Sequence, residues 1–155
     1  MATHPNTESF VSASLYLKSR ELTPAVISER LGLSPTRTRL KGKPVAEERP
    51  ELGGDPNNYF VLEVQRSVHR TEAVFVEDDS ATQLLRAAIE ELLEKIEPVA
   101  DKLLQLPVSA SLMCAYRAMP APEWFVLPNT LLRRLAVLNI SVTVLWTSPD
   151  PKPET

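Results

Sequence analysis

Cysteine and histidine are scarce in this chain, which has one cysteine, Cys114, and two histidines, His4 and His69. A single cysteine cannot form an internal disulfide bond or build a cysteine-based zinc site. His4 lies in a polar start, and His69 lies between Arg66 and Arg70, where the neighbouring cations disfavour its protonation and an exposed position is expected. The sequence therefore predicts no metal site and no cofactor.

A strong net charge and a long apolar run are also absent. The formal net charge is -3, which gives no reason to expect nucleic acid or an anionic membrane as a partner. The chain begins MATHPNTES, without the basic start and apolar stretch of a signal peptide. No apolar run approaches the roughly 20 residues that span a bilayer. We therefore expect a soluble, cytoplasmic protein.

Familiar catalytic motifs are missing as well. The sequence contains no HExxH, CxxC, GxSxG or glycine-rich phosphate-binding pattern. Cys114 falls on the apolar side of an alternating segment, where a free thiol is usually a small, inert core residue. The sequence thus predicts no catalytic residue and favours a protein that is not an enzyme.

What the chain does have is the composition of a globular protein: 155 residues, of which 43% are hydrophobic and 24% charged. We expect a single α+β domain over residues 9–146, with flexible tails at 1–8 and 147–155. Alternating apolar residues predict strands, and helical spacing with capping residues predicts helices. The expected strands are 10–18, 59–68, 108–114 and 140–146, with a short addition at 73–76; the expected helices are 24–31, 80–96, 99–106 and 130–138.

A faint internal repeat suggests how these elements are arranged. Ser-Ala-Ser-Leu occurs at 12–15 and again at 109–112, and the helix at 24–31 matches the pattern of residues 128–135. The repeat predicts two strand-helix-strand halves and a four- to five-stranded sheet with helices mainly on one face, ferredoxin-like in type.

Positive charge is concentrated in residues 34–44, which we call the basic segment. It opens a proline- and glycine-rich stretch, 34–58, that is expected to be a long loop. Alternate residues of extended chain point the same way, so the spacing of 37, 39 and 41 could align three cations on one surface. Arginine forks and hydroxyl groups bind phosphate or carboxylate oxygens. The candidate ligand-binding residues are Thr36, Arg37, Arg39, Lys41 and Lys43.

A second interpretation of the basic segment is a solvated loop without a ligand. Its cations would then pair with acidic residues just downstream, which are Glu47, Glu48, Glu51 and Asp55.

Trp124 and Phe125 follow Pro120 and Pro122 in a predicted loop, where two large apolar side chains need cover. They form either a lid over the sheet edge or a contact patch for a second subunit or another protein, because tryptophan is favoured at the centre of interfaces.

The motif Leu31-Gly32-Leu33-x-Pro35-Thr36, followed by the pair Lys41-Gly42, resembles a bacterial family known as domain of unknown function 4279. The resemblance covers about Ser9 to Trp146 and includes the order of the expected strands and helices. It supports the expected fold and implies no activity.

These observations give two hypotheses of function. The first is a small non-enzymatic interaction module, adaptor- or immunity/antitoxin-like, that binds another protein or self-associates. The alternative is binding of a small phosphorylated or carboxylated ligand at the basic segment. Neither involves nucleic acid or a membrane.

Overall fold

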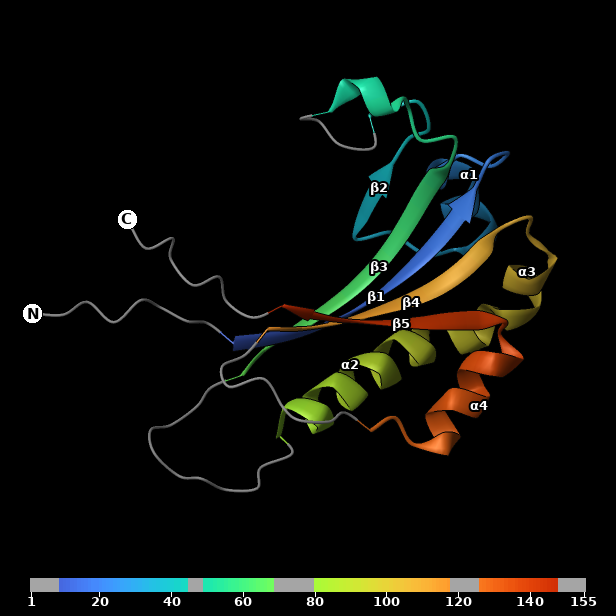
Figure 1. Ribbon diagram of the computed structural model, residues 1–155. Coiled ribbons are helices and arrows are strands. Elements are labelled where there is room, and N and C mark those ends of the chain that lie inside the picture. Colours follow the sequence, from blue (N-terminus) through green and yellow to red (C-terminus); the bar gives the residue numbers. More distant parts are fainter. Residues whose placement is uncertain (1–8, 45–48, 69–79, 118–125, 148–155) are drawn as a thin grey trace, which may run out of the picture.

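A computed structural model describes residues 9–44, 49–68, 80–117 and 126–147 of the chain. Five strands form one sheet (Figure 1). The strands are β1 (Ser9–Ser19), β2 (Arg37–Arg39), β3 (Asn58–Val68), β4 (Ser109–Arg117) and β5 (Ile140–Thr147). The predicted α+β class and five-stranded sheet are thus confirmed.

The sheet has the strand order β2-β3-β1-β4-β5, with β1 at its centre. β1 pairs antiparallel with both β3 and β4, and β2 pairs antiparallel with β3. β5 is parallel to its neighbour β4, so the sheet is mixed. The strands twist strongly from β3 to β5 (Figure 1). The ferredoxin-like detail stays a prediction.

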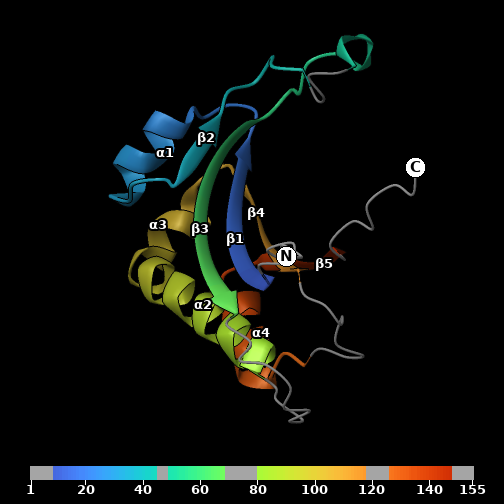
Figure 2. The same cartoon turned by 90° about the vertical axis from the view of Figure 1, so that its left-hand side faces the viewer.

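The α-helices lie on one side of this sheet, as expected (Figures 1 and 2). They are α1 (Pro24–Leu31), α2 (Ser80–Ile96), α3 (Ala100–Gln105) and α4 (Asn129–Val137), and two short 3-10 helices lie at η1 (Pro50–Leu52) and η2 (Glu97–Val99). The ends of α1 follow from its sequence. The Thr23 hydroxyl accepts a hydrogen bond from the Val26 amide at 3.3 Å, and Gly32 adopts the left-handed conformation at φ 67°.

The core lies between the helices and the inner face of the sheet. Alternate residues of β1 are buried there against the apolar stripe of α2. The buried residues of these two elements are Val11, Ala13, Leu15, Leu17, Leu85, Ala88, Ile89, Leu92, Leu93 and Ile96. Truncating one of the leucines to alanine typically costs about 2–5 kcal/mol of stability.

β1 is more deeply buried than the alternating pattern predicted. Ser12 and Ser14 lie on its outer face and yet are only 6% and 4% exposed. Ser14 has Glu63 of β3 and Met113 of β4 directly opposite it. Small side chains on a central strand are covered by the larger side chains of both neighbours, so these polar positions of the alternating segment are buried as well.

The internal repeat corresponds to the two strands at the centre of the sheet. β1 and β4 carry the Ser-Ala-Ser-Leu segments, and Leu15 lies directly opposite Leu112 in their antiparallel ladder. The strand that follows the helix is placed differently in the two halves. In the second half, β5 lies directly beside β4, whereas in the first half β3 separates β2 from β1. The similarity of the two halves therefore holds for β1 and β4 and does not extend to the complete sheet.

The predicted loop at 34–58 needs correction, because it contains the strand β2. Arg37, Thr38 and Arg39 pair with Val61, Phe60 and Tyr59 of β3. Three residues are too few to show an alternating pattern, so the edge of β3 and not local sequence sets this strand. The predicted tail 147–155 begins one residue too early, because Thr147 is the last residue of β5. The predicted addition at 73–76, the tail at 1–8 and residues 148–155 lie outside the described residues.

Among the described helices, none combines the length and the apolar character needed to cross a membrane. Within the same residues, no three histidine, cysteine or acidic side chains gather as metal ligands would.

Candidate functional site

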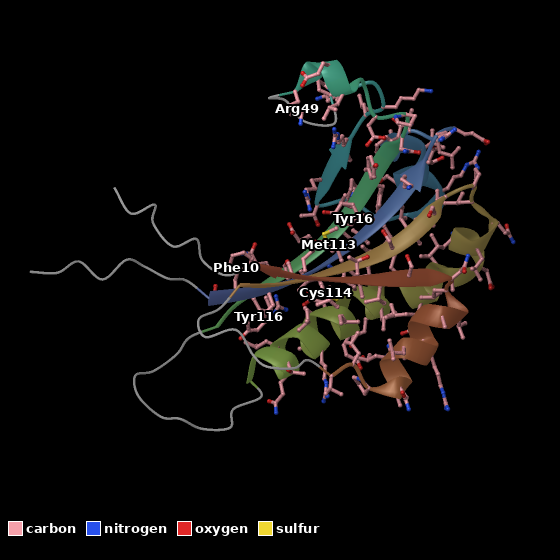
Figure 3. The ribbon with its side chains drawn as sticks, viewed as in Figure 1. Phe10, Tyr16, Arg49, Met113, Cys114 and Tyr116 are labelled. Atoms are coloured by element: carbon pink, nitrogen blue, oxygen red, sulfur yellow. The ribbon has the colours of Figure 1, made fainter. Side chains whose placement is uncertain are left out.

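The outer face of the sheet carries a hollow of about 410 Å³. Its lining comes from the three neighbouring strands β1, β2 and β3. The lining residues are Tyr16, Arg37, Thr38, Arg39, Tyr59 and Val61, and we refer to this site as the hollow. Figure 3 shows Tyr16 and Met113 on the side of the sheet away from the helices, and Cys114 and Tyr116 on the helix side.

Strand register explains why these side chains meet. Val61 of β3 lies opposite Arg37 of β2 on one side and opposite Tyr16 of β1 on the other. In the next row with the same orientation, Tyr59 lies between Arg39 and Lys18. Directly opposed residues of antiparallel strands have Cβ atoms about 4.5–5.5 Å apart. The two rows therefore bring arginine and tyrosine side chains together above Val61, which is only 3% exposed.

Arg37 is held against Tyr16. Its Nη2 donates a hydrogen bond to the Tyr16 hydroxyl at 2.6 Å, and its Cζ lies 5.4 Å from the centroid of the Tyr16 ring. The Glu63 carboxylate lies 3.8 Å from the same Nη2 and accepts a hydrogen bond from the Ser14 hydroxyl at 3.1 Å. These contacts orient the guanidinium group, although its side chain remains 51% exposed.

Tyr59 is fixed at both ends of its ring. The rings of Tyr16 and Tyr59 meet edge to face, with centroids 6.5 Å apart and an interplanar angle of 88°. The Tyr59 hydroxyl donates to Asp55 Oδ2 at 2.8 Å. Asp55 Oδ1 accepts from the amide and the side chain of Asn57, at 2.9 and 3.0 Å.

The Asp55–Tyr59 pair shifts the pKa of each partner. Burial opposes ionisation of Asp55, but hydrogen bonds from Tyr59 and Asn57 and the positive charge of Arg39 hold its pKa below the ordinary value. Burial, followed by the hydrogen bond to Asp55, raises the pKa of Tyr59. At neutral pH the pair is therefore an ionised carboxylate that accepts a hydrogen bond from a neutral phenol.

The segment that follows β2 is closed into a hairpin. The Gly42 amide donates to the Asp55 carbonyl at 2.8 Å, and the Asp55 amide donates to the Lys43 carbonyl at 2.9 Å. Arg39 donates to the Pro44 carbonyl. Gly42 and Gly54 approach so closely that a Cβ added to Gly54 would lie 2.9 Å from the Gly42 carbonyl oxygen.

The model of a protein family matches residues 8–147 of this chain, which is nearly its whole length. The family is described as Domain of unknown function (DUF4279). The chain belongs to this family. No curated protein and no solved structure matches the chain. The resemblance that the sequence suggested is confirmed. The description of the family names no activity.

The residues predicted to bind a ligand in this DUF4279 protein take different positions. Arg37 and Arg39 both line the hollow, whereas Lys41 and Lys43 are exposed and are not among its lining residues. The Thr36 hydroxyl accepts a hydrogen bond from the Glu63 amide at 3.0 Å. This hydrogen bond joins the residue before β2 to β3, so Thr36 has a structural contact. The structure thus brings two of the expected cations together, and their role in binding stays a prediction.

The main-chain amide of Lys41 has a structural partner. It donates to Asn58 Oδ1 at 2.9 Å, while the Asn58 side-chain amide donates to the Leu22 carbonyl at 3.0 Å. Asn58 is 2% exposed and ties the basic segment to the turn before α1.

The sequence analysis did not identify the aromatic part of the site. Tyr16 alternates with Leu15 and Leu17, and this alternation is the signal that could have placed it on the outer side of the strand. Tyr59 and Val61 lie on the outer face of β3 in the same way, but pairing with β2 was needed to link them to Arg37.

The alternative interpretation, in which downstream acids neutralise the basic segment, applies to part of it. Asp55 lies close enough to Arg39 for the arginine charge to lower its pKa. Glu51 instead pairs with Arg49 at 2.9 Å. Glu47, Glu48, Trp124 and Phe125 lie outside the described residues.

Proposed function

We propose that the hollow binds a small organic anion and that Arg37 and Arg39 hold its charged group. The observation that carries this proposal is that Arg37 and Arg39 both line one hollow of about 410 Å³. Pockets for small molecules commonly measure about 300–1,000 Å³ and combine apolar walls with a few polar groups. Tyr16, Tyr59 and Val61 are such walls.

Preorganisation supports the same proposal. Fixing a mobile loop on binding would consume much of the free energy that an anion supplies. Here β2 is paired with β3, Arg37 is bonded to Tyr16, and Arg39 is bonded to the Pro44 carbonyl. The guanidinium groups therefore lose less conformational freedom on binding than they would in an open loop. A charge-assisted hydrogen bond contributes about 1.5–3 kcal/mol.

Titration at low salt with acetate, benzoate and phosphate, followed by calorimetry, tests the proposal. We expect Arg37→Ala/Arg39→Ala to weaken binding of the preferred anion by roughly a hundredfold, because it removes two charge-assisted bonds that are each worth a factor of about ten. The matched control is Lys41→Ala/Lys43→Ala, which removes the same charge outside the hollow and should change the affinity less than about twofold. Equal losses in both double variants, or no binding to the wild type, would overturn the proposal.

The interaction-module hypothesis stays a separate proposal, based on the sequence at Trp124 and Phe125. Light scattering after gel filtration of the wild type and of Trp124→Ser/Phe125→Ser tests its self-association form. An unchanged monomeric mass in both would contradict that form.

A further inference from the structure

We infer that the anion bound in the hollow is a planar aromatic monocarboxylate, such as a benzoate-like acid. This inference rests on the proposed function of the same site. It names the ligand class from three properties of the hollow, which are its size, its aromatic walls and its local balance of charge.

The size of the hollow favours an organic ligand over a free inorganic anion. The volume of the hollow, about 410 Å³, falls within the range of pockets that hold small organic molecules. An ion of four or five heavy atoms would leave most of that space to solvent. A ligand with a ring and a carboxylate fills more of it and removes more apolar surface from water.

The walls favour a planar ring. Tyr16 and Tyr59 already meet edge to face, and the hydroxyl of each is held by a partner, Arg37 for Tyr16 and Asp55 for Tyr59. Their ring planes are therefore set before a ligand arrives. An aromatic ligand can add offset or edge-to-face contacts to such rings, while a saturated ring of similar size offers only its apolar area. Val61 supplies an apolar base between them.

The local charge favours a single negative charge on the ligand. Arg37 and Arg39 line the hollow. Lys18 is not among the lining residues, but it is exposed in the row of Tyr59 and Arg39, directly opposite Tyr59. Two carboxylates stand against these three cations: Glu63 beside Arg37, and Asp55, ionised at neutral pH, near Arg39. The group thus has one positive charge in excess. A monoanion neutralises this excess, whereas a phosphate dianion would leave the group with one negative charge in excess and would lose more hydration on entering the hollow.

Four probes separate these properties: benzoate, cyclohexanecarboxylate, acetate and phenyl phosphate, titrated by calorimetry at pH 7.5 and low salt. Benzoate is expected to bind roughly two- to tenfold more tightly than cyclohexanecarboxylate, the factor that one aromatic contact supplies, and more tightly than phenyl phosphate. Tyr59→Leu should remove the preference for benzoate over cyclohexanecarboxylate. Both carboxylates should still bind to this variant, but more weakly than benzoate binds to the wild type. Tyr16→Phe keeps the ring and frees Arg37, so it should retain the aromatic preference.

The outcomes distinguish the ligand class from the underlying anion site. Equal affinities for benzoate and cyclohexanecarboxylate, both lost in Arg37→Ala/Arg39→Ala, would overturn the aromatic inference and leave the anion site intact. Tighter binding of phenyl phosphate than of benzoate would overturn the monocarboxylate inference in the same way. Absence of binding for all four probes would overturn both proposals. Circular dichroism and thermal melting of each variant establish that it is folded.

Discussion

At the scale of single residues, side chains of the same charge in this DUF4279 protein take different positions because of where the backbone places them. Arg37 and Arg39 alternate on β2 and line the hollow, while Lys41 and Lys43 lie beyond the strand and are exposed. Of the three cations that the spacing 37, 39 and 41 was expected to align, two are among the residues that line the hollow. The strand ends at Arg39. The rule that alternate residues point the same way therefore does not extend to Lys41 and Lys43.

Cys114 is expected to be unreactive in the folded protein. Its side chain is fully buried, and burial raises the pKa of the thiol to about 11. At pH 8 only about one thiol in a thousand would then be ionised. We expect labelling by a disulfide reagent at pH 8 to be at least a hundredfold slower for the native protein than in concentrated urea, with Cys114→Ser as the unreactive control. Native labelling within tenfold of the unfolded rate would contradict this assignment.

The Asp55–Tyr59 hydrogen bond should make stability depend on pH at both extremes. Because the pKa of Asp55 is lowered on folding, its contribution is present above the ordinary carboxyl range and is lost as the pH falls through the folded-state pKa. Because the pKa of Tyr59 is raised, its contribution is present below about pH 10 and is lost as the pH rises through the folded-state pKa.

Urea denaturation of the wild type and Asp55→Asn measures the acid side of this dependence. At pH 7 the variant should be less stable by roughly 1 kcal/mol, and the difference should narrow below about pH 4, where the wild-type carboxylate becomes protonated. Tyr59→Phe, which removes the donor and keeps the ring, is the matched variant. A stability difference that stayed constant from pH 7 to pH 3 would show that the charge of Asp55 does not matter.

At the scale of elements, β2 depends on contacts beyond its own three residues. It pairs with β3, and the hairpin that follows it is closed by hydrogen bonds between Asp55 and both Gly42 and Lys43. The position of Arg39 therefore depends on how closely the two arms of this hairpin can approach.

Gly54→Ala should disturb this hairpin. The new Cβ would lie 2.9 Å from the Gly42 carbonyl oxygen, a contact that the backbone can relieve only by moving apart. We expect a loss of about 1–3 kcal/mol in the free energy of unfolding, together with weaker anion binding, measured by urea denaturation and calorimetry. Ser34→Ala, an exposed substitution in the same stretch, is the control and should stay within about 0.5 kcal/mol of the wild type. Wild-type stability in Gly54→Ala would show that the close approach is not needed.

At the scale of the whole molecule, the sheet formed by the described residues has β3, β1 and β4 in its interior and β2 and β5 at its two edges. β1 is paired on both sides over its length, whereas β2 and β5 each have one neighbour. The core residues on β1 also contact α2, so opening β1 requires most of the fold to open.

Native-state hydrogen exchange should follow this order. We expect the amides of β1 to exchange most slowly, near the rate set by global unfolding, and those of β2 to exchange at least tenfold faster because the edge opens locally. Mass spectrometry of short peptides measures both in one experiment, with the centre of β4 as an internal reference for a strand paired on both sides. Exchange of β2 as slow as that of β1 would contradict the sheet order.

Local patterns in the sequence were sufficient to predict the longer helices and strands. The alternation in β1, the stripe of α2 and the caps of α1 each repeat a simple rule several times, so the positions of these elements and the core residue Cys114 could be predicted. The basic segment could be singled out because charge is a property of composition. Its strand could not, because Arg37–Arg39 is too short to show a period and acquires its extended form by pairing with β3.

The sequence by itself therefore determined the α+β class, the apolar faces that form the core and the two arginines available for an anion. Only the tertiary structure decided that these arginines face Tyr16, Tyr59 and Val61 across three strands. The physical reason is that propensity and periodicity act between residues a few positions apart. The hollow instead depends on strand register, which pairs Tyr16 with Val61 and Val61 with Arg37 and is set by the packing of the whole sheet against its helices.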